Sequence, residues 1–300
     1  MSIVTRSVLE SVVPASGSRW IQKERDLAYL RQFFENRKRI VGLTGAGVST
    51  ASGIPDYRSP GRPPHRPMEA KDFVSSEANR RRYWARSFVG YGRMCLARPS
   101  FTHKWLADAE RAGTLRHTIT CNVDGLHRIA GSRKLTELHG QLHTVQCRTC
   151  QHRLHRFDFQ ILLQKLNPTW NAGPLHPPHP DATWISSEEA SNYEQQADSW
   201  IEIQDTTTSL MRPDGDTVVG ASAIANAIIP DCLRCGGGFY MPEVVFFGGS
   251  VPEAVTAEAR AKVEEADGLL VMGATLTTYS AFRLARLARE KGIPIILVNI

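Results

Sequence analysis

Long hydrophobic runs are missing from this sequence of 300 residues, and no stretch approaches the roughly 18 apolar residues that a membrane-spanning helix needs. Internal repeats are missing too, which excludes a solenoid or a propeller built from repeated units. Cysteine is scarce, with six residues, so a disulfide-dense scaffold is also excluded. The apolar fraction of 42% is ordinary for a globular protein, and the length suits one large domain with a small satellite.

The excess of positive charge is also small, with a net charge of only +6. Scattered, solvated Lys and Arg explain it better than a basic surface, so we expect no specific nucleic-acid partner and no membrane partner. Residues 1–22 contain five Ser, one Glu and two Arg, and they show no secretory signal. This composition is compatible with a flexible segment that serves as a mitochondrial presequence.

Short apolar runs alternate with helical patterns along most of the chain. The runs predict buried strands near residues 39–44, 117–121, 244–247, 268–272 and 293–299. Apolar residues at helical spacing predict helices over 23–36, 78–91, 101–111 and 279–291. This alternation predicts an α/β fold built on a Rossmann-like, doubly wound parallel sheet.

The middle of the chain breaks this rhythm. Residues 147–235 are polar and irregular, and 171–222 are rich in Pro, Ser, Thr, Asp and Gly, which predicts a loop-rich insertion. Four prolines within 59–67 predict a further loop. We therefore expect three parts: the N-terminal segment 1–22, a large α/β domain formed by 23–140 and 240–300, and a small module over 141–239.

A glycine-rich turn follows the first expected strand, with Gly45 and Gly47 directly after it. Glycine allows close approach of the backbone, and the N–H groups of a helix N-terminus attract anions, so the turn predicts a phosphate site. A tight strand-to-helix turn would need the same glycines, and Thr50 stands where a dinucleotide fingerprint has its third glycine. Asp56 and Arg58 place two opposite charges close by.

Two Cys-x-x-Cys pairs, Cys147 with Cys150 and Cys232 with Cys235, have the spacing of metal knuckles. Two knuckles supply the four thiolates that a tetrahedral zinc ion prefers, and a closed site of this kind has no open position for chemistry. We therefore expect one structural zinc ion per chain. A redox pair or a nucleic-acid-binding ribbon would also use this spacing.

Six segments together resemble the sirtuins, the NAD-dependent protein deacylases. They occur in the order of that family and span roughly residues 25 to 300: residues 45–58, 120–127, 135–140, the two cysteine pairs, 242–248 and 273–276. The resemblance implies NAD binding by the domain of 23–140 and 240–300, and a zinc-binding module over 141–239.

The resemblance also implies an activity. A sirtuin transfers an acyl group from a lysine side chain to ADP-ribose and releases nicotinamide, so acylated protein lysines are the expected partners. Segments 83–90 and 166–170, and Ser280, resemble the class II mitochondrial branch, which implies lipoyl, biotinyl or other long acyl groups and a location in the mitochondrial matrix. Two alternatives stay open: protein ADP-ribosyl transfer, and a catalytically weakened, zinc-stabilised scaffold.

Carried over by motif, His139 is the expected general base and Asn122 its catalytic partner in the nicotinamide pocket. A histidine suits this role because its pKa lies close to working pH. The expected cofactor-binding residues are Gly45, Ala46, Gly47, Ser49, Ile54, Asp56, Tyr57, Arg58, Cys121, Asn122, Val123, Asp124, Gly273, Ala274, Thr275 and Asn299. The expected substrate-binding segment is Val245, Phe246, Phe247 and Gly248, which a plain core strand would also explain.

Two departures from the family pattern affect the cofactor. Cys121 stands where sirtuins have a glutamine, and a thiol is a poor hydrogen-bonding substitute for an amide. The sequence stops at Ile300, where members of the family continue. Together these departures predict weak binding of NAD.

Overall fold

The computed structural model describes residues 23–57, 67–170 and 212–299. The expectations for segment 1–22, for Arg58 and the prolines at 60–64, for 171–211 and for Ile300 lie outside the described residues. Within the three described ranges, no helix combines the length and the apolar composition that crossing a membrane requires.

The larger sheet has five strands in the order β3-β2-β1-β7-β8, and every pair is parallel. The strands are β1 (Ile40–Thr44), β2 (Leu115–Thr120), β3 (Leu135–Glu137), β7 (Gly268–Met272) and β8 (Ile295–Val298). Thr44, the last residue of β1, lies opposite Thr120 and Met272, so three strands end at the same edge. The predicted parallel sheet is confirmed, with β3 as a strand that the sequence did not reveal.

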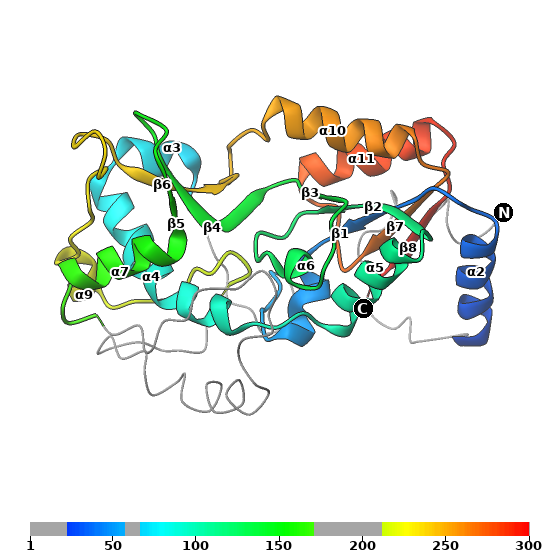
Figure 1. The fold of residues 1–300 in the computed structure, drawn as a ribbon, viewed down its shortest axis with the longest axis horizontal. Helices are drawn as coiled ribbons and strands as arrows, with labels where there is room; N and C mark the ends of the chain where they lie inside the picture. Colours follow the sequence, from blue (N-terminus) through cyan, green and yellow to red (C-terminus); the bar gives the residue numbers. More distant parts are fainter. Residues whose placement is uncertain (1–22, 58–66, 171–211, 300) are drawn as a thin grey trace.

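Helices cover both faces of this sheet, as a doubly wound fold requires (Figure 1). On one face, α10 (Glu253–Glu264) and α11 (Tyr279–Glu290) pack on Val41, Leu43 and their neighbours. The opposite face of the sheet, with Ile40, forms a second core with residues of α2 (Lys23–Glu35) and α5 (Phe101–Arg111). The short α6 (Leu126–Ile129) follows β2.

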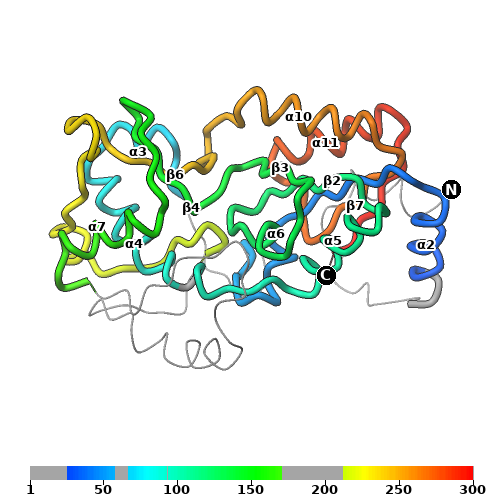
Figure 2. The backbone as a smooth tube through the Cα atoms, viewed as in Figure 1, coloured from blue at the N-terminus to red at the C-terminus, as the bar shows by residue number. Residues whose placement is uncertain are grey.

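A second, smaller sheet is antiparallel and has the order β5-β4-β6. Its strands are β4 (Gly140–Cys147), β5 (Arg153–His155) and β6 (Tyr240–Val244). The helices α3 (Ala70–Ser75), α4 (Glu77–Leu96), α7 (Arg156–Leu166) and α9 (Ala221–Ala225) lie on the same side of the molecule as this sheet (Figure 2). Aromatic side chains dominate their common core, with Phe73, Trp84, Phe88, Phe159 and Tyr240 fully buried.

The expectation of a parallel strand at 244–247 is wrong. The strand here is β6, which ends at Val244 and pairs antiparallel with β4 rather than joining the larger sheet. A short apolar run shows only that a segment is buried, and it does not reveal which sheet accepts it. Likewise α7 and β5 lie within 147–235, where the polar composition predicted irregular structure.

Candidate active site

One cavity of about 2160 Å³ opens at the carboxyl ends of β1, β2 and β7, and segments of the smaller sheet line its other side. Open α/β sheets bind ligands at this edge. Every described residue that the sequence nominated for cofactor, substrate or catalysis lines this cavity: Gly45, Ala46, Gly47, Ser49, Ile54, Asp56, Tyr57, Cys121, Asn122, Val123, Asp124, His139, Val245, Phe246, Phe247, Gly248, Gly273, Ala274, Thr275 and Asn299.

The glycine turn packs against the turn that follows β7. The N–H of Gly47 donates to the carbonyl of Gly273 at 2.9 Å, and a Cβ at either Gly45 or Gly47 would lie 2.8 Å from that turn. Close approach, rather than a positive φ, therefore requires these glycines, because Gly45 is extended at φ −135°. The helix after the turn, η1 (Ala46–Ser52), is a 3₁₀ helix closed by Gly53 at φ +79°.

Beneath this turn lies a buried polar network. The hydroxyl of Ser49 donates to Asp124 Oδ2 at 2.7 Å and accepts from Asn122 Nδ2 at 3.0 Å. Asn122 Nδ2 also donates to the carbonyl of Gly45 at 3.1 Å. The amide nitrogen of Asn122 therefore makes two hydrogen bonds within the described residues. The amide oxygen of Asn122 is the atom that can accept a hydrogen bond from a ligand.

Sequence reasoning missed His103, which supports the network from α5. The backbone N–H of Ser100 donates to His103 Nδ1 at 3.1 Å, so Nδ1 is an acceptor and Nε2 carries the hydrogen of the neutral ring. Nε2 lies 3.4 Å from Ser49 Oγ. Burial lowers the pKa of His103, which keeps the ring neutral. The spacing of Ser100 and His103 is that of a helix capping box, and this was the available signal.

His139 lies between β3 and β4, where the chain leaves the larger sheet for the smaller one. Its Nδ1 lies 3.0 Å from the carbonyl oxygen of Cys121, and a carbonyl can only accept, so Nδ1 carries the hydrogen. Burial lowers the pKa of His139. The neutral ring therefore has its lone pair on Nε2, where it can take up a proton. Ser280, which sequence reasoning did not place in the site, lies 2.7 Å from that nitrogen.

The next residue makes the change of sheet possible. Gly140 has φ +77°, and a Cβ there would collide with the carbonyl oxygen of Glu243 in β6. Only glycine adopts this backbone conformation at so close an approach without strain. The position of His139 is thus fixed by a backbone bend that joins the two sheets.

The nominated substrate segment leaves β6 along the cavity. The N–H of Val245 donates to the carbonyl of His139 at 2.8 Å, and the carbonyl of Phe247 accepts from the N–H of Ala70 at 3.0 Å. Phe246 is buried in the aromatic core, whereas 44% of Phe247 is exposed. The segment is therefore partly core and partly cavity wall.

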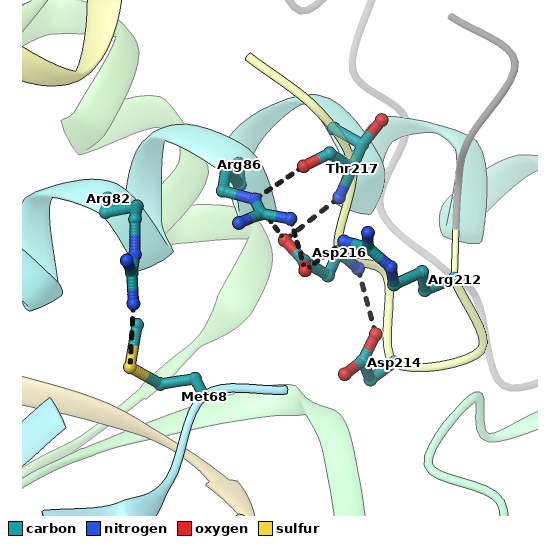
Figure 3. A network of polar contacts seen from close by, with 7 residues as sticks. All are labelled: Met68, Arg82, Arg86, Arg212, Asp214, Asp216 and Thr217. Atoms are coloured by element: carbon teal, nitrogen blue, oxygen red, sulfur yellow. Dashed lines mark hydrogen bonds and ion pairs between the residues drawn. The ribbon is translucent and has the colours of Figure 1, made fainter. Parts of the chain in front are cut away.

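A network of charges forms the far wall of the cavity (Figure 3). The carboxylate of Asp216 forms ion pairs with Arg86 at 2.7 Å and with Arg212 at 2.6 Å. Arg86 also donates a hydrogen bond to the carbonyl of Thr217 at 2.6 Å. The N–H of Asp216 donates to Asp214 Oδ1 at 3.2 Å. Burial raises the pKa of Asp214 to about 6. Sequence reasoning missed this wall because residues 212–217 fell inside the expected loop-rich insertion.

The four cysteines of the two knuckles come together as expected. Their Sγ atoms all lie within 4.8 Å of one another, with Cys147 to Cys235 at 3.8 Å and Cys150 to Cys232 at 3.5 Å. A tetrahedral zinc ion with Zn–S bonds of about 2.3 Å separates its ligands by roughly 3.8 Å, so the donor set fits zinc. Gly238 supports the fit, because a Cβ there would lie 2.5 Å from Cys147 Sγ.

Comparison with known proteins agrees with this arrangement. The model of the Sir2 family matches residues 45–280. NAD-dependent protein deacylase Sirt4 of Drosophila melanogaster is 37% identical over 92% of this chain and 79% of its own length. The mitochondrial NAD-dependent protein lipoamidase sirtuin-4 of Bos taurus is 39% identical over 90% of this chain and 76% of its own length.

Solved structures share the fold. A sirtuin structure concerned with substrate affinity superposes with a TM-score of 0.62 at 24% identity, over 91% of this chain and 86% of that one. A Sir2 homologue in complex with ADP-ribose superposes with a TM-score of 0.60 at 25% identity, over 90% and 83%. From the family match, the identity to these relatives and the cavity between the two sheets, we conclude that the chain belongs to the Sir2 family.

Proposed function

We propose that this chain is an NAD-dependent protein-lysine deacylase, which transfers an acyl group from lysine to ADP-ribose and releases nicotinamide. The observation that carries this proposal is His139, a neutral imidazole with its lone pair on Nε2 in the cavity between the glycine turn and the segment of Val245–Gly248. The family match and the relatives named as deacylase and lipoamidase support it.

NAD fits the cavity side formed by 23–140 and 240–300. The turns at 45–47 and 273–275 line the cavity at the carboxyl ends of β1 and β7, the edge at which open α/β sheets bind ligands, so we place the diphosphate there. Asn122 and Asp124 offer an amide oxygen and a carboxylate to hydroxyl and carboxamide groups. We assign Asn299, at the end of β8, to the adenosine side.

When bound, NAD supplies the ribose carbon that receives the acyl oxygen as nicotinamide leaves. The chain's own part is to orient the reactants and to hold a proton. His139 Nε2 accepts a proton from a ribose hydroxyl, and the carbonyl of Cys121 stabilises the resulting imidazolium through Nδ1. The zinc module supports β4 and β6 and takes no chemical role, because four thiolates close its coordination sphere.

The names of the relatives support a proposal for the acyl group and the location. The bovine relative is named a mitochondrial lipoamidase, so we propose lipoyl, biotinyl or other long acyl groups on protein lysines as substrates, and the mitochondrial matrix as the location.

The test uses a panel of acetyl, lipoyl, biotinyl, succinyl and glutaryl peptides with NAD. We expect His139→Ala to reduce formation of O-acyl-ADP-ribose by at least about 100-fold, the usual contribution of a positioned base. His155→Asn is the matched control, because His155 is exposed and caps α7 far from the cavity lining. Nicotinamide release without O-acyl-ADP-ribose would instead indicate ADP-ribosyl transfer, and an unchanged rate in His139→Ala would exclude His139 as the base.

A further inference from the structure

Both ring nitrogens of His139 are engaged in the unliganded protein. Nδ1 donates to the carbonyl oxygen of Cys121 at 3.0 Å, which leaves Nε2 as the acceptor of the neutral ring. Ser280 Oγ lies 2.7 Å from Nε2, so its hydroxyl donates to that nitrogen. The two partners belong to different elements: Cys121 follows β2, and Ser280 lies in the first turn of α11.

The position of Ser280 is set by a well-packed helix. Thr278 is the N-cap of α11, and Ala281, Leu284 and Ala285 in the same helix are buried against the larger sheet. Ser280 itself is half-buried and lines the cavity. Its hydroxyl is therefore a fixed feature of the cavity wall, 141 residues distant in sequence from the ring that it contacts.

We infer that Ser280 positions His139 and relays the ribose proton to it. One hydrogen bond, to Cys121, would fix the tautomer of the ring but still allow it to tilt about that bond. The second bond, from Ser280, fixes the plane of the ring and the direction of the Nε2 lone pair. This inference rests on the proposed function, in which Nε2 takes up a proton.

The chemistry of a hydroxyl suits this task better than a charged or purely donating group. Nε2 has one lone pair and Ser280 donates to it, so the proton of a ribose hydroxyl reaches Nε2 through Ser280. The Oγ of Ser280 takes the ribose proton as its own hydrogen passes to Nε2, and Ser280 then accepts from the protonated ring. The contact can therefore persist through proton uptake without favouring either state strongly. A carboxylate at this position would favour the imidazolium and weaken the base, and an alanine would leave the ring held at one nitrogen.

The kinetic test compares Ser280→Ala with Ser280→Thr, which keeps the hydroxyl. A neutral hydrogen bond corresponds to a change of about 2- to 10-fold, so we expect Ser280→Ala to lower kcat by that factor while KM for NAD and for the acyl peptide changes less than about twofold. Ser280→Thr should restore kcat. Ser222→Ala is the control, because Ser222 holds the same second position in α9, is exposed, and lies outside the cavity lining.

A second measurement needs neither NAD nor turnover. In protein with labelled histidine, nuclear magnetic resonance relaxation should show a rigid His139 ring, protonated at Nδ1, in the parent protein and in Ser280→Thr. The ring should gain mobility in Ser280→Ala. An equally rigid ring in Ser280→Ala, or a loss of kcat no greater than in Ser222→Ala, overturns the inference. Absence of O-acyl-ADP-ribose in every variant, with ring mobility behaving as expected, would count against the proposed function alone.

Discussion

At the scale of single residues, burial decides which groups of the cavity are charged. It lowers the pKa of His139, so the base stays neutral, and it raises the pKa of the Cys121 thiol to about 12, so this side chain stays neutral as well. Cys121 therefore offers the cofactor a weak, uncharged donor where sirtuins have a glutamine amide. The predicted weak binding of NAD is consistent with this chemistry and stays a prediction.

The lowered pKa of His139 leads to a prediction on pH dependence. A base must be neutral in the free enzyme, and the acid limb of kcat/KM reports its pKa. Since burial moves this pKa below the ordinary value of about 6.5, deacylation should remain active below pH 6.5 and fall only at lower pH. The measurement is kcat/KM against pH with a stable acyl peptide. An acid limb centred above pH 6.5 would contradict the assignment.

At the scale of elements, close backbone contacts place the walls of the cavity. Gly90 in α4 is one such contact: a Cβ there would overlap the carbonyl oxygen of Gly215, in the loop that carries Asp214 and Asp216. The loop cannot easily move away from α4, because its Asp216 forms an ion pair with Arg86 of that helix. The charged wall therefore depends on Gly90, which the sequence placed in a family-like segment without revealing this contact.

We expect Gly90→Ala to lower the free energy of unfolding by about 1–3 kcal/mol, the usual cost of overpacking, and to reduce activity because the loop must move away from the cavity. Denaturant titration and the acyl-peptide assay check this. Gly237→Ala is the matched control, since a Cβ there meets nothing within 4 Å and its φ is not positive. Equal stability of the two variants would show that the loop is not seated on α4 as described.

The zinc site belongs to the same scale, because its ligands connect the end of β4 to the segment before β6. Removing the ion with a chelator leaves four thiolates close together without a cation, and Cys150→Ser leaves the ion one ligand short, so either change should lower Tm and abolish activity. Thermal unfolding with and without chelator, with metal content measured in parallel, checks this. A chain that unfolds at the same temperature without metal would refute the structural role.

Much of the fold could be predicted because burial in a parallel sheet leaves a strong pattern. The runs that became β1, β7 and β8 are largely apolar, and α11 shows a clear apolar stripe, whereas β2 is buried although half or more of its residues are polar. The smaller sheet could not be predicted, because β5 has only three residues, much of β4 is half-buried, and β6 pairs with β4 from the far side of the insertion.

Within the site, residues that belong to compact motifs were predicted, and those that act from a distance were not. Ser280 and Asp214 line the cavity only through tertiary packing, which no local spacing encodes. The spacing of Ser100 and His103 indicated a helix cap but not the contact of His103 with Ser49. The glycine turn was located correctly, but its glycines serve close packing against Gly273, and the helix after it is of the 3₁₀ type.

At the scale of the whole molecule, buried neutral histidines make stability depend on pH. His127 is fully buried, bonds Thr44 through Nε2 at 2.9 Å, and has no partner for Nδ1 among the described residues. Burial, with a smaller effect of His103, lowers the pKa of His127 to about 3. Burial also lowers the pKa values of His103 and His143.

The sign of the effect follows from linkage. A histidine whose pKa is lower in the folded state contributes its full stability above the unfolded pKa of about 6.5, and this contribution is lost as pH falls toward the folded pKa. The free energy of unfolding should therefore decline between about pH 6.5 and pH 3, and decline less steeply in His127→Asn. Urea unfolding across this range checks the slope, and a variant slope equal to that of the parent would exclude His127 as a contributor.

The bend at Gly140 also has a consequence for how this protein can vary. His139 directly precedes Gly140, whose backbone conformation lets the chain pass from the larger sheet to the smaller one. The distance of His139 from both sheets is therefore fixed by the number of residues between β3 and β4. An inserted or deleted residue between β3 and β4 would shift the imidazole out of register with α11. The junction of Leu138 and His139 between the two strands must therefore keep its length, whereas loops elsewhere around the cavity can change length without moving the base.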